Sequence, residues 1–138
     1  MSKVLAKEWL KAAIYDLILL DEIKNNTNLT TMIAFHSQQT IEKVLKALLC
    51  FNKIDVPKIH SLNKLFKLNK SDIGEVNNRL VNKLDKLYID SRYPGDMGLL
   101  PYGKPTQEDA NEFYEFAQSI FDKVCEILEI DKCEITDA

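Results

Sequence analysis

The stretch from Ala34 to Leu49 constrains the fold of this chain more than any other segment. Its apolar residues recur at intervals of three and four, which is the spacing of one face of an α-helix. Among them stand a histidine, two glutamines, a glutamate and two lysines. A helix that only filled a core would not need so many polar side chains. The stretch therefore predicts a helix that packs on one face and presents functional groups on another.

Helical periodicity extends along the rest of the chain, and no segment alternates as a strand does. Polar breaks and prolines separate the periodic segments. We therefore predict an all-α fold, an up-and-down bundle of four long helices plus one short helix, forming a single domain over residues 1–138. The predicted helices cover residues 4–24, 30–52, 61–68, 71 to just before Pro94, and 106–130.

Two helix starts carry recognisable caps. Ser71 is predicted to be the N-cap of the helix that ends before Pro94, because its hydroxyl can accept from the free amides of the next turn. Thr106 and Asp109 resemble a capping box with Asp in place of Glu. Between these helices, the segment from Pro94 to Pro105 holds three of the four prolines and three of the four glycines. Functional groups concentrate in such long loops, although a loop that only crosses the end of the bundle is the alternative.

The net charge of −3 is unevenly distributed along the chain. Residues 1–42 carry −1, residues 43–83 carry +6, and residues 84–138 carry −8. A basic middle and an acidic end can attract each other within one bundle or between two subunits, and the basic middle could also face a phosphate backbone. A solvated charged face is the other interpretation.

The cysteines and the hydropathy exclude several classes of protein. Cys50, Cys125 and Cys133 are odd in number and form no C-x-x-C pair, so neither a disulfide framework nor a zinc site is predicted. Three free thiols favour a reducing, cytoplasmic location. No apolar run reaches about 18 residues, so no membrane contact is predicted. We expect no metal and no cofactor.

Three polar residues share one face of the central predicted helix. His36, Gln39 and Lys43 lie at i, i+3 and i+7. A histidine and a lysine on one face can bind an anionic group. Alternatively, His36 and Gln39 cross-link helices through hydrogen bonds inside the bundle. Glu42 is expected to pair with Lys46 one turn later.

Arg92 and Tyr93 end a predicted helix and open the Pro/Gly-rich loop. The planar guanidinium of Arg92 suits phosphate, and tyrosine rings at 88 and 93 can stack on a base. Alternatively, Arg92 satisfies the last helix carbonyls or pairs with Asp16 or Asp85. The predicted ligand-binding residues are His36, Gln39, Lys43, Arg92, Tyr93 and Tyr102, and no catalytic motif is complete.

Two further polar residues carry structural predictions. Asp16 falls on an otherwise apolar helix face, where a carboxylate needs a partner, and Arg92 or His36 would serve. His60 follows Pro57 and is predicted to close that turn and cap the short helix.

The order and spacing of these residues resemble the HEPN domain family over nearly the whole chain. The most specific block lies in the central predicted helix, and the turn from Pro57 to Leu62 and the Tyr93-Pro94 pair also fit. The positions that carry the resemblance are Trp9, Ala12, Asp16, Leu17, Ala34, His36, Gln38, Gln39, Glu42, Lys43, Lys46, Ala47, Leu48, Pro57, His60, Leu62, Leu84, Asp85, Tyr88, Arg92, Tyr93, Pro94, Ala110 and Ala117.

This resemblance implies several functions. Many members are similar to dimeric ribonucleases with an Arg-x(4–6)-His motif, whereas others bind nucleotides or work with a small nucleotidyltransferase. The motif is absent here, because no histidine follows Arg79 or Arg92. The positions where it would stand hold Leu84, Asp85 and Lys86 after the first arginine and Met97, Gly98 and Leu99 after the second.

We therefore expect a homodimeric HEPN protein that binds nucleotide or RNA phosphate. Its expected partner is a nucleotidyltransferase, in a toxin–antitoxin or defence-like system. One alternative is a metal-independent ribonuclease toxin with a rearranged site, in which His36 or His60 replaces the missing histidine. A helper chain that only contacts protein is a third possibility, and it would leave a large apolar patch exposed.

Overall fold

The computed structural model describes residues 2–90 and 103–136, and these residues form an all-helical structure. The all-α prediction is confirmed. The elements in chain order are α1 (Ser2–Ile23), α2 (Thr30–Phe51), α3 (Leu62–Leu68), α4 (Lys70–Ile73), α5 (Asn78–Asp90), α6 (Gln107–Leu128) and the 3-10 helix η1 (Lys132–Glu134).

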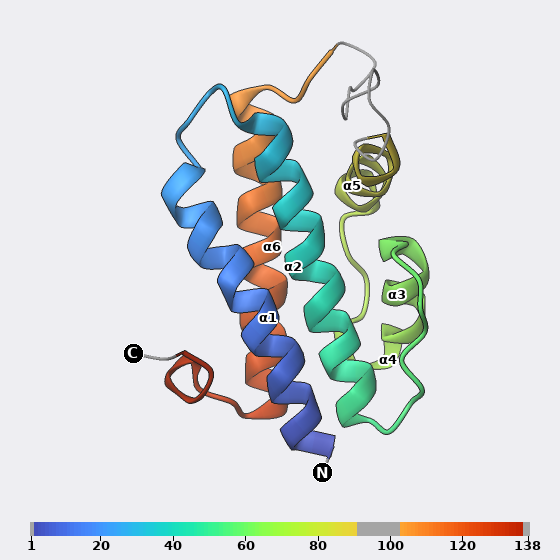
Figure 1. Ribbon diagram of the computed structural model, residues 1–138. Coiled ribbons are helices and arrows are strands. Elements are labelled where there is room, and N and C mark those ends of the chain that lie inside the picture. Colours follow the sequence, from blue (N-terminus) through green and yellow to red (C-terminus); the bar gives the residue numbers. More distant parts are fainter. Residues whose placement is uncertain (1, 91–102, 137–138) are drawn as a thin grey trace.

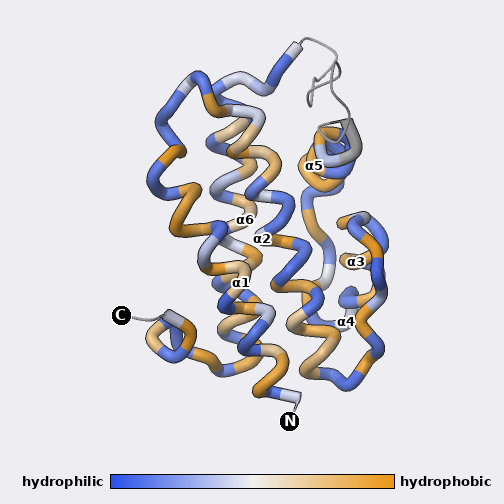
Figure 2. The backbone as a smooth tube through the Cα atoms, in the orientation of Figure 1, coloured by the Kyte–Doolittle hydropathy of each residue, from blue (hydrophilic) through white to orange (hydrophobic). Residues whose placement is uncertain are grey.

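The longest helices pack side by side, with α2 in the middle (Figure 1). α1 runs antiparallel to α2 on one side, α3 and α5 lie on the other, and α6 runs behind α1 and α2. Hydrophobic and hydrophilic segments alternate along each long helix (Figure 2), as expected when only one face of a helix is covered. We call the face of α2 that points away from α6 its outer face. α1 borders this face on one side, and α3 and α5 border it on the other.

The core forms where the apolar stripes of the three long helices meet. The stripe of α2 contributes Ile41, Leu45 and Leu48, and α6 contributes Phe113 and Phe121, all fully buried. Burial of a leucine or phenylalanine side chain contributes roughly 1.5–3 kcal/mol. Alanines lie between these large residues on every long helix and let the backbones approach: Ala6, Ala13, Ala34, Ala47, Ala110 and Ala117.

The prediction of one continuous helix from Ser71 onward is wrong. Ser71 lies inside the short α4, which ends at Gly74. Gly74 has φ 77° and ψ −154°, a backbone conformation that only glycine adopts without strain. The next helix starts after Asn77, whose side-chain oxygen accepts from the amides of Arg79 and Leu80 at 3.1 and 3.3 Å. By contrast, the capping box predicted at residues 106–109 is confirmed.

The start of α3 is held by a carboxylate from α5. Asp85 accepts from the backbone amides of Leu62 and Asn63 at 2.7 and 3.0 Å, and from the Asn63 side chain at 2.8 Å. Ser61 is the N-cap, with its hydroxyl accepting from the Lys64 amide at 3.3 Å. The capping role predicted for the residue before Ser61 is therefore wrong: His60 turns toward α2 instead.

We expect Asp85→Ala to lower the free energy of unfolding by about 2 kcal/mol, because it orphans amides that otherwise donate to a charged acceptor. Urea denaturation followed by circular dichroism measures this. Glu75→Ala is the matched control, because its ion pair with Lys70 is fully solvated and such pairs contribute roughly 0–1 kcal/mol. Equal stability losses in the two variants would contradict the role given to Asp85.

Candidate functional site: two polar networks on the central helix

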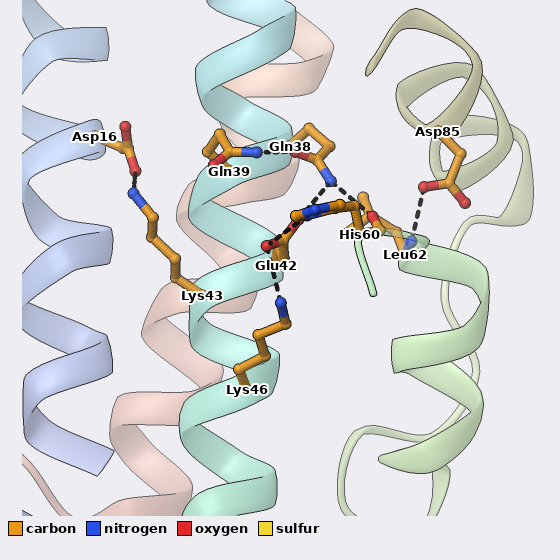
Figure 3. A network of polar contacts seen from close by, with 9 residues as sticks. All are labelled: Asp16, Gln38, Gln39, Glu42, Lys43, Lys46, His60, Leu62 and Asp85. Carbon is orange, nitrogen blue, oxygen red and sulfur yellow. Dashed lines mark hydrogen bonds and ion pairs between the residues drawn. The ribbon is translucent and has the colours of Figure 1, made fainter. Parts of the chain in front are cut away.

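Polar side chains of α2 form two networks on its outer face (Figure 3). The α1-side network consists of Asp16, His36 and Lys43, and it joins α2 to α1. The α3-side network consists of Gln38, Glu42, Lys46 and His60, and it joins α2 to the segment before α3. Each network is built around one carboxylate.

In the α1-side network, Asp16 holds two partners two helical turns apart. Its Oδ1 lies 2.9 Å from His36 Nδ1, and its Oδ2 accepts from Lys43 Nζ at 2.6 Å. The Asp16 side chain is 11% exposed, so the predicted pairing of a nearly buried carboxylate with His36 is confirmed. Because a carboxylate can only accept, Nδ1 of His36 carries the proton, which leaves Nε2 as the other functional atom of the ring.

In the α3-side network, Glu42 is the centre. Its side chain is 7% exposed and accepts from Lys46 Nζ at 3.1 Å and from Gln38 Nε2 at 3.2 Å. The predicted pair of Glu42 and Lys46 is confirmed, and the Lys46 ammonium also lies 5.7 Å from the ring centroid of Trp9. His60 Nδ1 lies 3.1 Å from the same carboxylate. A buried carboxylate with three partners and a buried lysine above an aromatic ring make this network rigid.

Gln38 also connects α2 to the segment before α3, in addition to the contact between Glu42 and His60. Its Nε2 donates to the backbone carbonyl of His60 at 2.9 Å, and its Oε1 accepts from Gln39 at 2.7 Å. Gln38 is fully buried. Both the ring and the backbone of His60 are therefore held by α2.

Aromatic rings line the boundary between the two networks. Phe35 contacts His36 edge-on at 5.3 Å and stacks on Tyr88 of α5 at 5.7 Å. Tyr88 also lies 5.3 Å from the ring of His60, whose side chain is 49% exposed. The two histidines thus approach one aromatic cluster from opposite sides, and this cluster offers flat surfaces on which a base could stack.

The structure places three of the six predicted ligand-binding residues together. His36, Gln39 and Lys43 share the outer face of α2, as their spacing predicted, and each bonds to a protein side chain. His36 cross-links α2 to α1, which is the alternative considered for it, whereas Gln39 bonds to its neighbour Gln38 on the same helix. The other three predicted residues, Arg92, Tyr93 and Tyr102, lie outside the described residues.

Sequence reasoning missed Gln38 and Phe35 as members of the site. Their spacing held a signal, because Phe35, Gln38 and Glu42 lie at i, i+3 and i+7 and therefore share a face. The link from Glu42 to His60 had no local signal, since 18 residues and a turn separate them. Within the described ranges, no cluster of three or more His, Cys, Asp or Glu could hold a metal ion, and no helix is long and apolar enough to cross a membrane.

We expect Lys46→Met to lower the free energy of unfolding by about 3 kcal/mol, because it leaves the buried Glu42 carboxylate without its cation. Adding Glu42→Gln should restore most of this loss, since the double variant buries no charge at that position. Denaturant unfolding of the single and double variants measures the coupling. Lys11→Met, which breaks a solvated pair with Glu8, is the control. Additive effects of the two substitutions would contradict a coupled buried pair.

Comparison with known proteins identifies the family of this chain. The family model described as HEPN domain matches residues 6–128, which is most of the chain and includes both polar networks. No curated protein and no solved structure matches the chain. Because the match spans α2 with all its polar residues, as well as both bordering sides, the chain belongs to the HEPN domain family.

Proposed function

We propose that this HEPN domain protein binds the phosphate of a nucleotide or of RNA on the outer face of α2. Membership of the family links the chain to nucleotide- and RNA-related functions in general. The observation that carries the proposal is the α1-side network, in which Asp16 holds an imidazole and an ammonium side by side on a partly exposed surface.

The α1-side network can accept a phosphate with little rearrangement. The side chain of Lys43 is 25% exposed and that of His36 is 19% exposed, so both can be reached from solvent. A phosphate that approaches this face can take a hydrogen bond from Lys43 in place of Asp16. Asp16 would remain bound to His36, so the carboxylate would not be left without a partner.

The remaining parts of the proposed site lie on α5 and in the sequence that follows it. Tyr88 places an aromatic ring beside Phe35 and His60 at this border of α2. We propose that Arg92 adds a guanidinium for phosphate, and that Tyr93 and Tyr102 stack on a base. A phosphate held by charged groups with a base on aromatic rings is a common way to bind a nucleotide.

We also propose that the chain acts as a homodimer and with a small nucleotidyltransferase, in the cytoplasm, within a toxin–antitoxin or defence-like system. Support for a protein partner comes from the outer face of α1, where Leu5, Tyr15, Ile18 and Leu19 are 40–55% exposed. Such a row of large apolar residues favours a covered surface. The three unpaired cysteines support a reducing compartment.

Two histidine–carboxylate pairs favour a second candidate function, metal-independent RNA cleavage. Asp16 orients His36, and Glu42 orients His60. A carboxylate on Nδ1 fixes the tautomer of a histidine and leaves Nε2 to take or give a proton. The ring that reaches the scissile phosphate would take the proton of a 2′-hydroxyl and then give it to the leaving 5′-oxygen.

We expect Lys43→Gln and Arg92→Ala each to weaken binding of ATP, GTP or a short RNA by roughly 10- to 100-fold, because each removes a charge-assisted hydrogen bond to phosphate. Calorimetric titration at low salt measures the dissociation constants. Lys11→Gln removes a positive charge from α1 outside the site and should bind as the wild type does. Unchanged affinity in both site variants would rule out the proposed site.

For the ribonuclease alternative, the wild type should cleave an end-labelled RNA in the presence of EDTA. His36→Ala or His60→Ala should slow that cleavage by at least 100-fold, because general acid–base catalysis contributes about 10²- to 10⁴-fold. Gel analysis of the products gives the rates, and far-ultraviolet circular dichroism checks that each variant folds. Cleavage that persists unchanged in both variants would exclude these histidines as acid and base.

A further inference from the structure

The α3 side of the molecule carries lysines that no ion pair uses within the described part of the chain. We call Lys58, Lys64, Lys67 and Lys86 the lysine edge. All four are exposed. By contrast, Lys43, Lys46, Lys70 and Lys83 all pair with carboxylates.

Among the described residues, no nearby carboxylate forms an ion pair with the lysine edge. Glu42 is buried against its own network, Asp85 accepts from the start of α3, and Glu75 pairs with Lys70. Residues 52–68 contain four lysines and one aspartate, whereas α6 contains six acidic residues and one lysine. Figure 1 shows α3 at the side of the bundle opposite α1, with α6 behind. The charge of the protein is therefore separated in space, as well as in the sequence.

A hydrogen bond between α3 and α5 groups three of these lysines. Asn63 Nδ2 donates to Asn82 Oδ1 at 2.9 Å. Lys64 follows Asn63 directly, Lys67 lies one turn after it, and Lys86 lies one turn after Asn82. These three lysines therefore stand within about one helical turn of this contact, on both helices.

A hollow of about 180 Å³ opens beside the same contact. Its lining includes Asn63 and Lys67 of α3, Asn78 of α5, the ion pair of Lys70 with Glu75, and the apolar side chains of Phe66, Val76 and Val81. Ammonium and amide groups are donors that suit the oxygens of a phosphate. The lysine edge thus combines a positive surface with a recess that a phosphate group can enter.

The lysine edge is continuous with the proposed site through His60. Lys58 precedes His60 by two residues, and the half-exposed His60 ring lies against Tyr88. Lys86 stands two residues before Tyr88 on α5 and therefore on another face of that helix, so Lys58 is the lysine that joins the edge to these rings. Aromatic rings at one end of a positive surface are the combination that binds a single strand, with bases on the rings and phosphates on the lysines.

We infer that the ligand of this protein is a single RNA strand several nucleotides long, whose phosphodiester backbone follows the lysine edge away from the Tyr88–His60 pair. This inference rests on the proposed function and extends it, because a mononucleotide would occupy only the outer face of α2. Each phosphate contact on a single strand contributes about 0.7 to the slope of log affinity against log salt. Four contacts would weaken binding by about 50-fold between 50 and 200 mM salt.

The test compares two double variants of equal charge. Lys64→Gln with Lys67→Gln removes two lysines of the edge, and Lys3→Gln with Lys11→Gln removes two from α1. A fluorescent 12-nucleotide oligouridylate is titrated from 50 to 200 mM KCl, and ATP is titrated in parallel. The edge variant should lose about 1.4 from the salt slope for the RNA and keep the wild-type affinity for ATP. The α1 variant should match the wild type for both ligands.

A DNA strand of the same length separates backbone contacts from contacts to the 2′-hydroxyl. The edge variant should lose the same slope on DNA as on RNA, because lysines on phosphates do not distinguish the two. Lys58→Gln with Lys86→Gln is the second edge variant, and circular dichroism verifies the fold of all three.

Four outcomes would overturn the inference. Salt slopes that are equal in the wild type and in both folded edge variants would exclude the lysine edge. So would equal losses of slope in the edge and α1 variants. A third outcome is that RNA binds no more tightly than ATP while ATP binding still depends on Lys43 and Arg92. That result would exclude a single-stranded ligand and leave the proposed function intact. Absence of binding to ATP and RNA alike would overturn both.

Discussion

The buried carboxylate of Glu42 joins the central helix to the segment that leads into α3. It binds Lys46 along its own helix and the ring of His60 across the gap to the next segment. Once His60 is held, Ser61 and Leu62 lie where Asp85 of α5 can bond to the start of α3. The position of α5, and with it Tyr88, therefore follows from a charge that α2 could not bury without partners.

The two networks differ in how easily they can open, and this difference bears on function. Glu42 and Lys46 are both 7% exposed, so separating them would leave each buried charge without its ionic partner and without water. Lys43 is 25% exposed, and its ammonium can reach solvent when it leaves Asp16. The α3-side network thus acts as scaffold, while the α1-side network can exchange an internal carboxylate for an external phosphate. The same residues can cross-link helices in the free protein and bind ligand in the complex.

Features that are set within one helix could be predicted from the sequence, whereas contacts between separate helices could not. The face shared by His36, Gln39 and Lys43 and the capping box at Thr106 are set by spacing within one helix, and both were predicted. The need of Asp16 for a partner also followed from its place on an apolar face. The break after α4 was missed, because the periodicity of the apolar residues continues across Gly74 and only its backbone dihedral angles end the helix. The partners of Glu42 and Asp85 depend on how separate helices meet, which no local pattern encodes.

The consequences of the uneven charge could likewise be predicted only in part from the sequence. On α5, Arg79 bonds to Glu112 at 2.8 Å and Lys83 lies 3.7 Å from Asp109, so part of the basic middle attracts the acidic last helix, as one interpretation of the sequence expected. These two ion pairs connect α5 to α6. Lys64 and Lys67 lie on α3, where the neighbouring carboxylate bonds to backbone amides instead. Because Asp85 is held at the start of α3 by these hydrogen bonds, it forms no ion pair with Lys64 or Lys67, and both lysines stay exposed.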